Sequence, residues 1–251
     1  MIVSCYGIST EGRVKEVNQD SIFYKVTPDN NAGVFVVADG VGGLASGEVA
    51  ARIATQEVEN HWIDLMRACS ANDTQVVVDA LSELIFFING KIQAFNIEAE
   101  KKSATTFSLL LVYFNRYYIA HVGDSRIYTV DTSRGRPFAL LRATRDHSKE
   151  VLRERNGRQF MQSMLTDGLG YRKGIRCDCS YGVVDEETGS FIICSDGIYK
   201  RQSDELICEI VDGNGFEPER VCGELVNNAM RLGESDNISA IFVNVSNAHS
   251  V

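Results

Sequence analysis

The chain has little proline and no long apolar run. It contains three prolines in 251 residues, and no low-complexity tract, internal repeat or structureless linker interrupts it. No apolar stretch approaches the roughly 20 residues that a membrane-spanning helix needs. Residues 1–5 lack the basic start and long apolar core of a secretory signal. We therefore expect one domain over residues 1–251, a cytoplasmic location and no membrane partner.

The sequence also lacks a regular set of cysteine pairs. Its seven cysteines are odd in number and scattered. Cys177 and Cys179 form the only close pair, and no second pair follows at the spacing of a zinc finger. We expect reduced thiols in preference to a disulfide framework or a structural zinc site.

The chain has fewer positively charged than negatively charged residues. Lysine and arginine number 25 against 34 acidic residues, so the formal net charge is −9. Because such a chain repels phosphate backbones, we expect no nucleic-acid partner. The richest basic run, residues 134–158, is interrupted by Asp146, Glu150 and Glu154. This run fits either a solvated surface segment or a docking surface for an acidic partner.

One apolar segment ends abruptly in an acidic residue. Residues 34–38 are small or apolar, and Asp39 follows them with three glycines among the next four positions. This pattern predicts a buried strand that ends at a polar rim. A carboxylate placed there must be paired, protonated or bound to a metal. Neighbouring glycines let backbone carbonyls approach an ion, and hard divalent cations prefer such oxygen ligands.

The same design recurs elsewhere in the chain. Asp196 follows the apolar residues 191–194, Asp124 follows residues 121–123, and Asp236 precedes the apolar run 238–243. Each case alone is weak evidence, because Asp-Gly and similar pairs are common in turns. Four aspartates at strand ends together predict a metal site with oxygen ligands.

The order of the predicted elements indicates the fold class. Two long helices, one starting at the N-cap Ser46 and one capped by Thr74, are flanked by runs of strands. Such blocks imply an α+β fold, an αββα sandwich of two antiparallel sheets flanked by helices, with the aspartates at one edge. The predicted strands are residues 2–9, 21–26, 33–38, 105–114, 117–122, 126–130, 138–143, 190–194 and 238–245. The later predicted helices are residues 149–155, 203–211 and 218–232.

Eight short motifs, in order, resemble those of one known family. They are residues 12–20, 37–43, 47–48, 104–106, 121–126, 144–148, 195–197 and 236–237. Together they resemble the metal-dependent Ser/Thr protein phosphatases, the PPM or type 2C family, in its compact bacterial form. The resemblance runs from about residue 5 to residue 244.

The resemblance implies an αββα sandwich and a set of metal ligands. Two Mn²⁺ or Mg²⁺ ions would be bridged by Asp39, with the carbonyl of Gly40 on one ion and Asp196 and Asp236 on the other. Asp20 would hold a metal-bound water. A third ion is implied at aspartates such as Asp124 and Asp196.

The implied chemistry needs no protein nucleophile. Two neighbouring cations lower the pKa of a bridging water, so that hydroxide attacks the phosphorus of a phosphoserine or phosphothreonine directly. The residues expected to carry catalysis are Asp39, Asp196, Asp236 and Lys15. The expected partners are phosphorylated proteins, substrates of a Ser/Thr kinase in a signalling system, and the expected state is a monomer.

Four positions depart from the family pattern, and one of them is Ala104, where glycine is common. Lys15 stands where the family usually has a phosphate-binding arginine, so it is either a phosphate ligand without the bidentate fork or a surface lysine. Asp167 stands in place of an arginine near the flap, residues 146–182. Val41 replaces the histidine of some members. His147 is then either a general acid or, as we favour, a structural residue bonded to a loop carboxylate.

Two alternative functions stay open, and the first of them is motivated by the departures at Lys15 and Asp167. One is a catalytically weak phosphatase-like module that binds phosphoproteins without hydrolysing them. The other is an unrelated metal hydrolase of small phosphate esters, which would require the order of the motifs to be coincidental.

Overall fold

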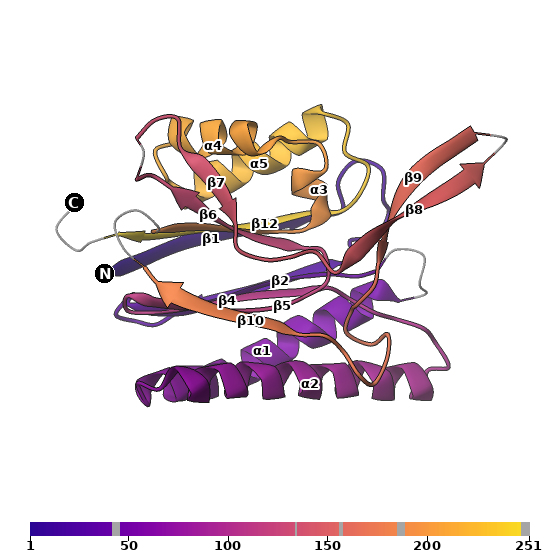
Figure 1. The fold of residues 1–251 in the computed structure, drawn as a ribbon, viewed down its shortest axis with the longest axis horizontal. Helices are drawn as coiled ribbons and strands as arrows, with labels where there is room; N and C mark the ends of the chain where they lie inside the picture. The colour runs from indigo at the N-terminus through magenta and orange to yellow at the C-terminus, as the bar shows by residue number, and fades with distance from the viewer. Residues whose placement is uncertain (42–45, 134, 156–157, 185–188, 247–251) are drawn as a thin grey trace.

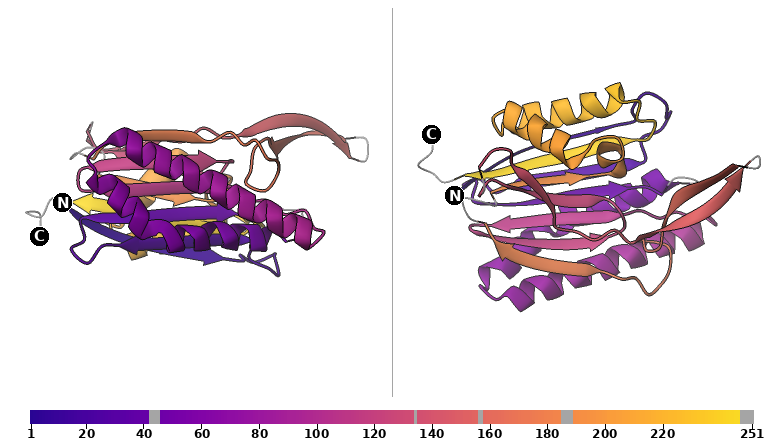
Figure 2. Two further views of the ribbon diagram at one scale, coloured as in Figure 1. Left: turned by 90° about the horizontal axis from the view of Figure 1, so that it is seen from below. Right: turned by 45° about the horizontal axis from the view of Figure 1, so that its top comes forward.

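The computed structural model describes residues 1–41, 46–133, 135–155, 158–184 and 189–246. Two five-stranded antiparallel sheets lie face to face, and helices cover the outer surface of each (Figure 1). Figure 2 shows the molecule from below, with two long helices in front of the sheets, and tilted so that its top comes forward. The predicted α+β class and αββα sandwich are confirmed.

The first sheet has the strand order β1-β12-β11-β6-β7. Its strands are β1 (Ile2–Thr10), β12 (Ile238–Ser246), β11 (Ser190–Cys194), β6 (Arg126–Asp131) and β7 (Ala139–Arg142). The second sheet has the order β10-β5-β4-β3-β2. Its strands are β10 (Asp178–Val183), β5 (Arg116–Val122), β4 (Phe107–Tyr113), β3 (Ala32–Asp39) and β2 (Asp20–Val26). The first and last strands, β1 and β12, are therefore neighbours in the first sheet.

Two long helices cover the second sheet. They are α1 (Gly47–Ser70) and α2 (Thr74–Glu98). The apolar stripe of α2, which includes Val77, Leu81 and Ile88, is buried against this sheet. The first sheet is covered by α3 (Asp196–Tyr199), α4 (Asp204–Gly213) and α5 (Pro218–Arg231). Among the described residues, no helix is both long enough and apolar enough to cross a bilayer.

The strands alternate between two cores. In β3, Val34 and Val36 pack under α1 and α2, whereas Phe35 and Val37 face the other sheet. Because successive side chains of a strand point to opposite faces, Asp39 continues the face of Phe35 and Val37. The carboxylate of Asp39 therefore lies at the end of β3, at the edge of the space between the two sheets.

The predicted helix at residues 149–155 is wrong. These residues form β8 (Ser148–Arg155), which pairs with β9 (Arg158–Leu165) in a hairpin that projects beyond the sandwich (Figures 1 and 2). Lysine, glutamate and arginine favour helix locally. The pairing with a partner strand a few residues later overrides this preference. The strand β10 and the single turn α3 were not predicted.

The two predicted helix caps also differ in detail. Asp73, not Thr74, caps α2, and its side chain accepts a hydrogen bond from the backbone N–H of Gln75 at 2.9 Å. Ser46 does occupy the N-cap position of α1, but its side chain makes no capping hydrogen bond. Gly42 and Gly43, part of the glycine-rich segment after Asp39, lie outside the described residues.

Candidate active site

One cavity of about 350 Å³ lies at the edge where the strand-end aspartates meet. Four of the predicted aspartates line it together with Gly40, although they are far apart in sequence: Asp39, Asp124, Asp196 and Asp236. Residues 162–165 of β9 form another part of its wall. The aspartates predicted to converge are therefore brought to one place.

Asp20 and Asp39 face each other across β2 and β3. They are directly opposite in the strand register, and Oδ2 of Asp20 accepts a hydrogen bond from the Ser239 hydroxyl at 2.7 Å. The backbone N–H of Asp39 donates to Thr106 Oγ1 at 2.9 Å, and its carbonyl accepts from the Thr105 hydroxyl at 2.9 Å. The backbone of Asp39 is thus held on both sides, which leaves its carboxylate available to the cavity.

Gly40 lies where two backbone segments touch. A Cβ atom at this position would lie 2.5 Å from the carbonyl carbon of Gly47 and 2.6 Å from the carbonyl oxygen of Gln19. Its N–H donates to that same Gln19 carbonyl at 3.1 Å. Glycine is therefore required for the start of α1 to pack against the end of β3, and this packing leaves the Gly40 backbone on the cavity wall.

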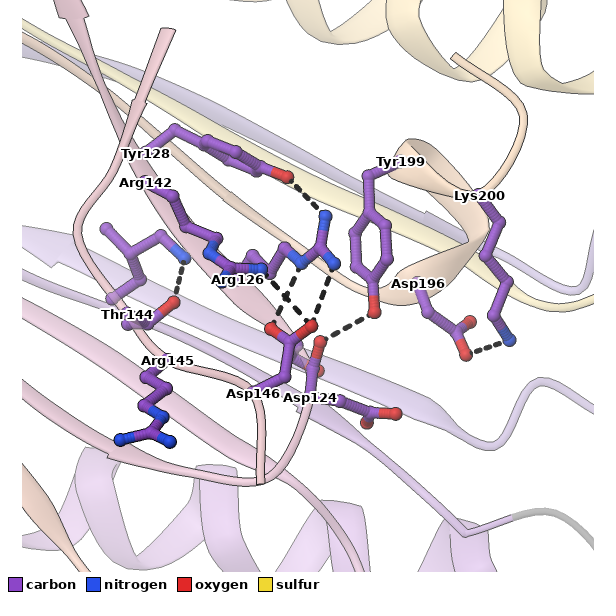
Figure 3. Close-up of polar contacts among 12 residues, drawn as sticks. Asp124, Arg126, Tyr128, Arg142, Thr144, Arg145, Asp146, Asp196, Tyr199 and Lys200 are labelled. Carbon is purple, nitrogen blue, oxygen red and sulfur yellow. Dashed lines mark hydrogen bonds and ion pairs between the residues drawn. The ribbon is translucent and has the colours of Figure 1, made fainter. Parts of the chain in front are cut away.

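Asp196 stands at the first position of α3, directly after β11. Its Oδ2 forms an ion pair with the ammonium group of Lys200, one helical turn later (Figure 3). Tyr199, the residue before Lys200, donates a hydrogen bond from its hydroxyl to the backbone carbonyl of Asp124 at 2.8 Å. This short helix therefore connects two of the cavity aspartates.

Asp236 belongs to the loop before β12 and is the most exposed of the group. Oε1 of Glu234 accepts hydrogen bonds from the backbone N–H groups of Ser235 and Asp236 at 2.7 and 3.0 Å. The side chain of Asp236 is 42 % exposed and pairs with Lys15, whose Nζ lies 3.2 Å from Oδ1. Lys15 therefore lies beside a cavity aspartate, and its binding of phosphate stays a prediction.

Asn237 connects this loop to the N-terminal segment. Its side-chain amide donates to the carbonyls of Glu11 and Val17 at 3.2 and 3.0 Å. Its Oδ1 accepts from the backbone N–H of Gln19 at 3.0 Å. A single side chain thus holds the loop that carries Lys15 and leads into Asp20.

The cavity carboxylates share a strongly unfavourable environment. Burial raises the pKa of Asp39 well above its usual range, and the charges of Asp20 and Asp196 raise it further. Burial likewise raises the pKa of Asp20 to about 6. Burial and then the charge of Asp196 raise the pKa of Asp124 to about 6. The cost of removing several like charges from water is offset only when these carboxyl groups are protonated, paired or bound to a cation.

The donor set fits a hard divalent cation. Oδ1 of Asp20 and Oδ1 of Asp196 are buried without a hydrogen-bond partner. Carboxylate and carbonyl oxygens suit Mg²⁺ and Mn²⁺ better than Zn²⁺. As the described side chains stand, no three His, Cys, Asp or Glu residues already enclose a common point. The ammonium of Lys200 pairs with the other carboxylate oxygen of Asp196, Oδ2.

A second layer of polar contacts supports the Asp124 loop (Figure 3). The guanidinium of Arg126 donates to both carboxylate oxygens of Asp146 at 3.1 and 2.8 Å and to the Tyr128 hydroxyl at 2.9 Å. It also stacks 3.5 Å from the ring centroid of Tyr199. These groups fix the strand-end turn that presents Asp124.

His147 and Asp167 lie outside the cavity lining. His147 is buried. Its Nδ1 accepts a hydrogen bond from the Gly123 backbone N–H at 3.2 Å, and its Nε2 lies 3.0 Å from Oδ2 of Asp178. This geometry supports its structural role over that of a general acid. Asp167 is also buried and accepts from Arg172 at 2.6 Å. Its negative charge is therefore neutralised inside the flap and does not face the cavity.

Two residues of the site were not predicted from the sequence. Lys200 lines the cavity, and its spacing of four residues from Asp196 could have signalled an ion pair on a helix. Asn237 belongs to a recognised motif, but its clamping role depends on residues more than 200 positions away. Sequence spacing carries no signal for such contacts.

Comparisons with known proteins identify the family of the chain. A model of the protein phosphatase 2C family matches residues 10–240. Protein phosphatase PhpP of Streptococcus pneumoniae is 28 % identical over 247 residues, which cover 94 % of each chain.

Two solved structures share the fold. The serine/threonine phosphatase Stp1 from Staphylococcus aureus superposes with a TM-score of 0.80 at 19 % identity, covering 98 % of this chain and 96 % of the other. The catalytic domain of the serine/threonine protein phosphatase PstP, solved with two manganese ions, superposes with a TM-score of 0.71 at 22 % identity, covering 98 % and 99 %. Because the family model spans most of the chain, the protein belongs to the protein phosphatase 2C family, and the expected enzyme class, a protein serine/threonine phosphatase, is confirmed.

Proposed function

We propose that the protein hydrolyses phosphoserine and phosphothreonine esters in proteins, using two Mn²⁺ or Mg²⁺ ions. The observation that carries this proposal is the convergence of buried aspartates on one cavity, with orphaned carboxylate oxygens at Asp20 and Asp196. Asp39 and the carbonyl of Gly40 would hold one ion, and Asp39, Asp196 and Asp236 the other. Asp20 would act through a bound water.

The protein's own groups would position the substrate and the charges. When bound, the two ions supply a hydroxide nucleophile at neutral pH and neutralise charge that develops at phosphorus. The hydrogen bonds from Thr105 and to Thr106 keep Asp39 in place, so that its carboxylate needs no rearrangement. Lys15, beside Asp236 at the exposed side of the site, would bind the phosphate of the substrate.

The substrates, the location and the oligomeric state of the enzyme are part of the same proposal. PhpP and Stp1 are protein phosphatases by name, which supports phosphorylated proteins as substrates and a Ser/Thr kinase as the opposing enzyme. We infer a cytoplasmic monomer. The net charge of −9 agrees with a protein that does not bind nucleic acid.

The first test is metal-dependent hydrolysis by two aspartate variants. Asp39→Asn and Asp236→Asn should each lower turnover of p-nitrophenyl phosphate by orders of magnitude, because each removes a ligand charge and leaves the shape unchanged. Asp64→Asn, an exposed change on α1, is the matched control and should keep full activity. Circular dichroism should show all three folded. Wild-type activity in both cavity variants would refute the proposed site.

The same assay distinguishes the enzyme from a binding module. Wild-type protein should hydrolyse the substrate with added Mn²⁺ and lose activity with a chelator. Binding of a phosphopeptide without hydrolysis under any metal condition would favour the phosphatase-like module. Trapping of a covalent phosphoenzyme with labelled substrate would exclude direct attack by hydroxide.

A further inference from the structure

We propose that the ammonium group of Lys200 takes the place of a third metal ion, so that this chain binds two divalent ions and not three. The inference rests on the proposed function, because it concerns the ion count of the same site. It starts from one contact: Lys200 forms an ion pair with Asp196 across one turn, and both residues line the cavity (Figure 3).

The position of Lys200 is set by the backbone. Residues four apart on a helix lie on the same face, so the turn that begins at Asp196 directs Lys200 back toward it. The N–H of Lys200 donates to the Asp196 carbonyl at 3.0 Å, which closes this turn. The ammonium group therefore has a defined site on the wall of the cavity.

Lys200 lines the same cavity as both aspartates to which the family resemblance assigns a third ion. It pairs with Asp196, and Asp124 lines the same cavity, where its backbone carbonyl accepts a hydrogen bond from Tyr199, the residue before Lys200. The ammonium group pairs with Oδ2 of Asp196, whereas Oδ1 of Asp196 is buried without a hydrogen-bond partner. A divalent ion between Asp124 and Asp196 would have to displace this ammonium or accept its repulsion.

The other lysine of the site is placed differently. Lys15 and its partner Asp236 are 40 % and 42 % exposed, so water screens their interaction. Lys200 is itself 45 % exposed, but its partner Asp196 is only 13 % exposed, so the two pairs differ in the burial of the carboxylate. The competition with a metal ion is therefore assigned to Lys200 and not to Lys15.

The test counts bound manganese in the purified protein. Native mass spectrometry and equilibrium dialysis against Mn²⁺ should find two ions in the wild type. Lys200→Gln should bind a third ion at least tenfold more tightly than the wild type does. Lys200→Arg, which retains the charge, should restore the count of two. Lys91→Gln, a loss of a lysine on α2 remote from the cavity, is the matched control and should also bind two.

Each outcome decides the inference. Three ions in the wild type, or two in Lys200→Gln with unchanged affinities, would overturn it and leave the proposed function intact. No bound manganese in the wild type would refute the proposed function itself. Circular dichroism of the metal-free variants checks folding, and Lys200→Met replaces Lys200→Gln if the latter does not fold.

Discussion

At the scale of single residues, the site consists of charges that the fold places together against their mutual repulsion. Asp20 and Asp39 are adjacent across two strands, and burial and repulsion raise the pKa of both. The lysines at positions 15 and 200 offset part of this charge. The site is thus arranged to gain free energy when cations bind.

Lys15 provides a prediction about phosphate binding. Lys15→Arg should lower the KM for a phosphopeptide roughly fivefold, because a guanidinium adds a second, parallel hydrogen bond to the phosphate. Steady-state kinetics with Mn²⁺ measure the change. Lys25→Arg, whose lysine lies over the ring of Trp62, is the control and should leave KM unchanged. An unchanged KM in Lys15→Arg would show that this side chain does not touch the substrate.

His121 provides a prediction about acid stability. It is buried between the Ser108 hydroxyl and the Arg145 carbonyl, and burial lowers its pKa to about 4. Because the unfolded state takes up a proton at higher pH than the folded state, stability is lost as pH falls from about 6.5 toward 4. The loss from this group is about 3 kcal/mol.

The pH dependence can be isolated with one substitution. Urea unfolding of metal-free His121→Gln at pH 7, 5.5 and 4 should show a smaller decrease in the free energy of unfolding than the wild type. His61→Gln, at a half-exposed histidine of α1, should retain the wild-type dependence. Equal slopes in the wild type and His121→Gln would contradict the assignment.

At the scale of elements, single side chains connect segments that the sequence separates. Asn237 ties the loop of residues 11–19 to the start of β12 by three hydrogen bonds. The ends of β2 and β12 are joined in turn by the contact between Asp20 and Ser239. The cavity is therefore assembled from loops whose positions depend on such clamps.

Asn237→Ala tests this clamp. It should lower the free energy of unfolding by about 2–3 kcal/mol, because three hydrogen bonds are lost and backbone groups of the loop lose their partner. Urea denaturation measures the change. It should also raise KM, since the loop carries Lys15. Asn214→Ala removes one local hydrogen bond at the end of α4 and is the control. A stability loss no larger than that of the control would refute the clamp.

At the scale of the whole molecule, the two sheets hold the aspartates at one edge. The layer between them is filled by side chains of both sheets, including Phe35 and Phe191. Because Phe35 and Asp39 share one face of β3, the packing between the sheets and the geometry of the site depend on the same strand.

Phe35→Ala tests the contribution of this layer. The substitution should cost about 3–5 kcal/mol of the free energy of unfolding, because a large, fully buried ring is removed and leaves a cavity. Thermal and urea unfolding measure it. Phe86→Ala, at a side chain 51 % exposed on α2, should change stability by less than about 1 kcal/mol. A loss below 1 kcal/mol for Phe35→Ala would show that the sheets do not pack as described.

Much of this molecule could be predicted from local pattern. The strand at residues 190–194 and the end of β3 at Asp39 follow from apolar runs that stop at polar residues, and the stripe of α2 follows from helical spacing. The order of the motifs identified the family. The hairpin of β8 and β9 could not be predicted in this way, because its residues favour helix locally and become strands only by pairing with each other.

The sequence alone determined which residues are aspartates at strand ends, which faces of the helices are apolar and which family the chain belongs to, because these properties depend on neighbours along the chain. The tertiary structure alone decided that Lys200 pairs with Asp196 at the cavity, that Asn237 clamps the N-terminal loop, and that the charge of Asp167 is neutralised within the flap. The physical reason is that the strength of a charge or hydrogen bond depends on its partner and on its burial, and both are set by the folded chain.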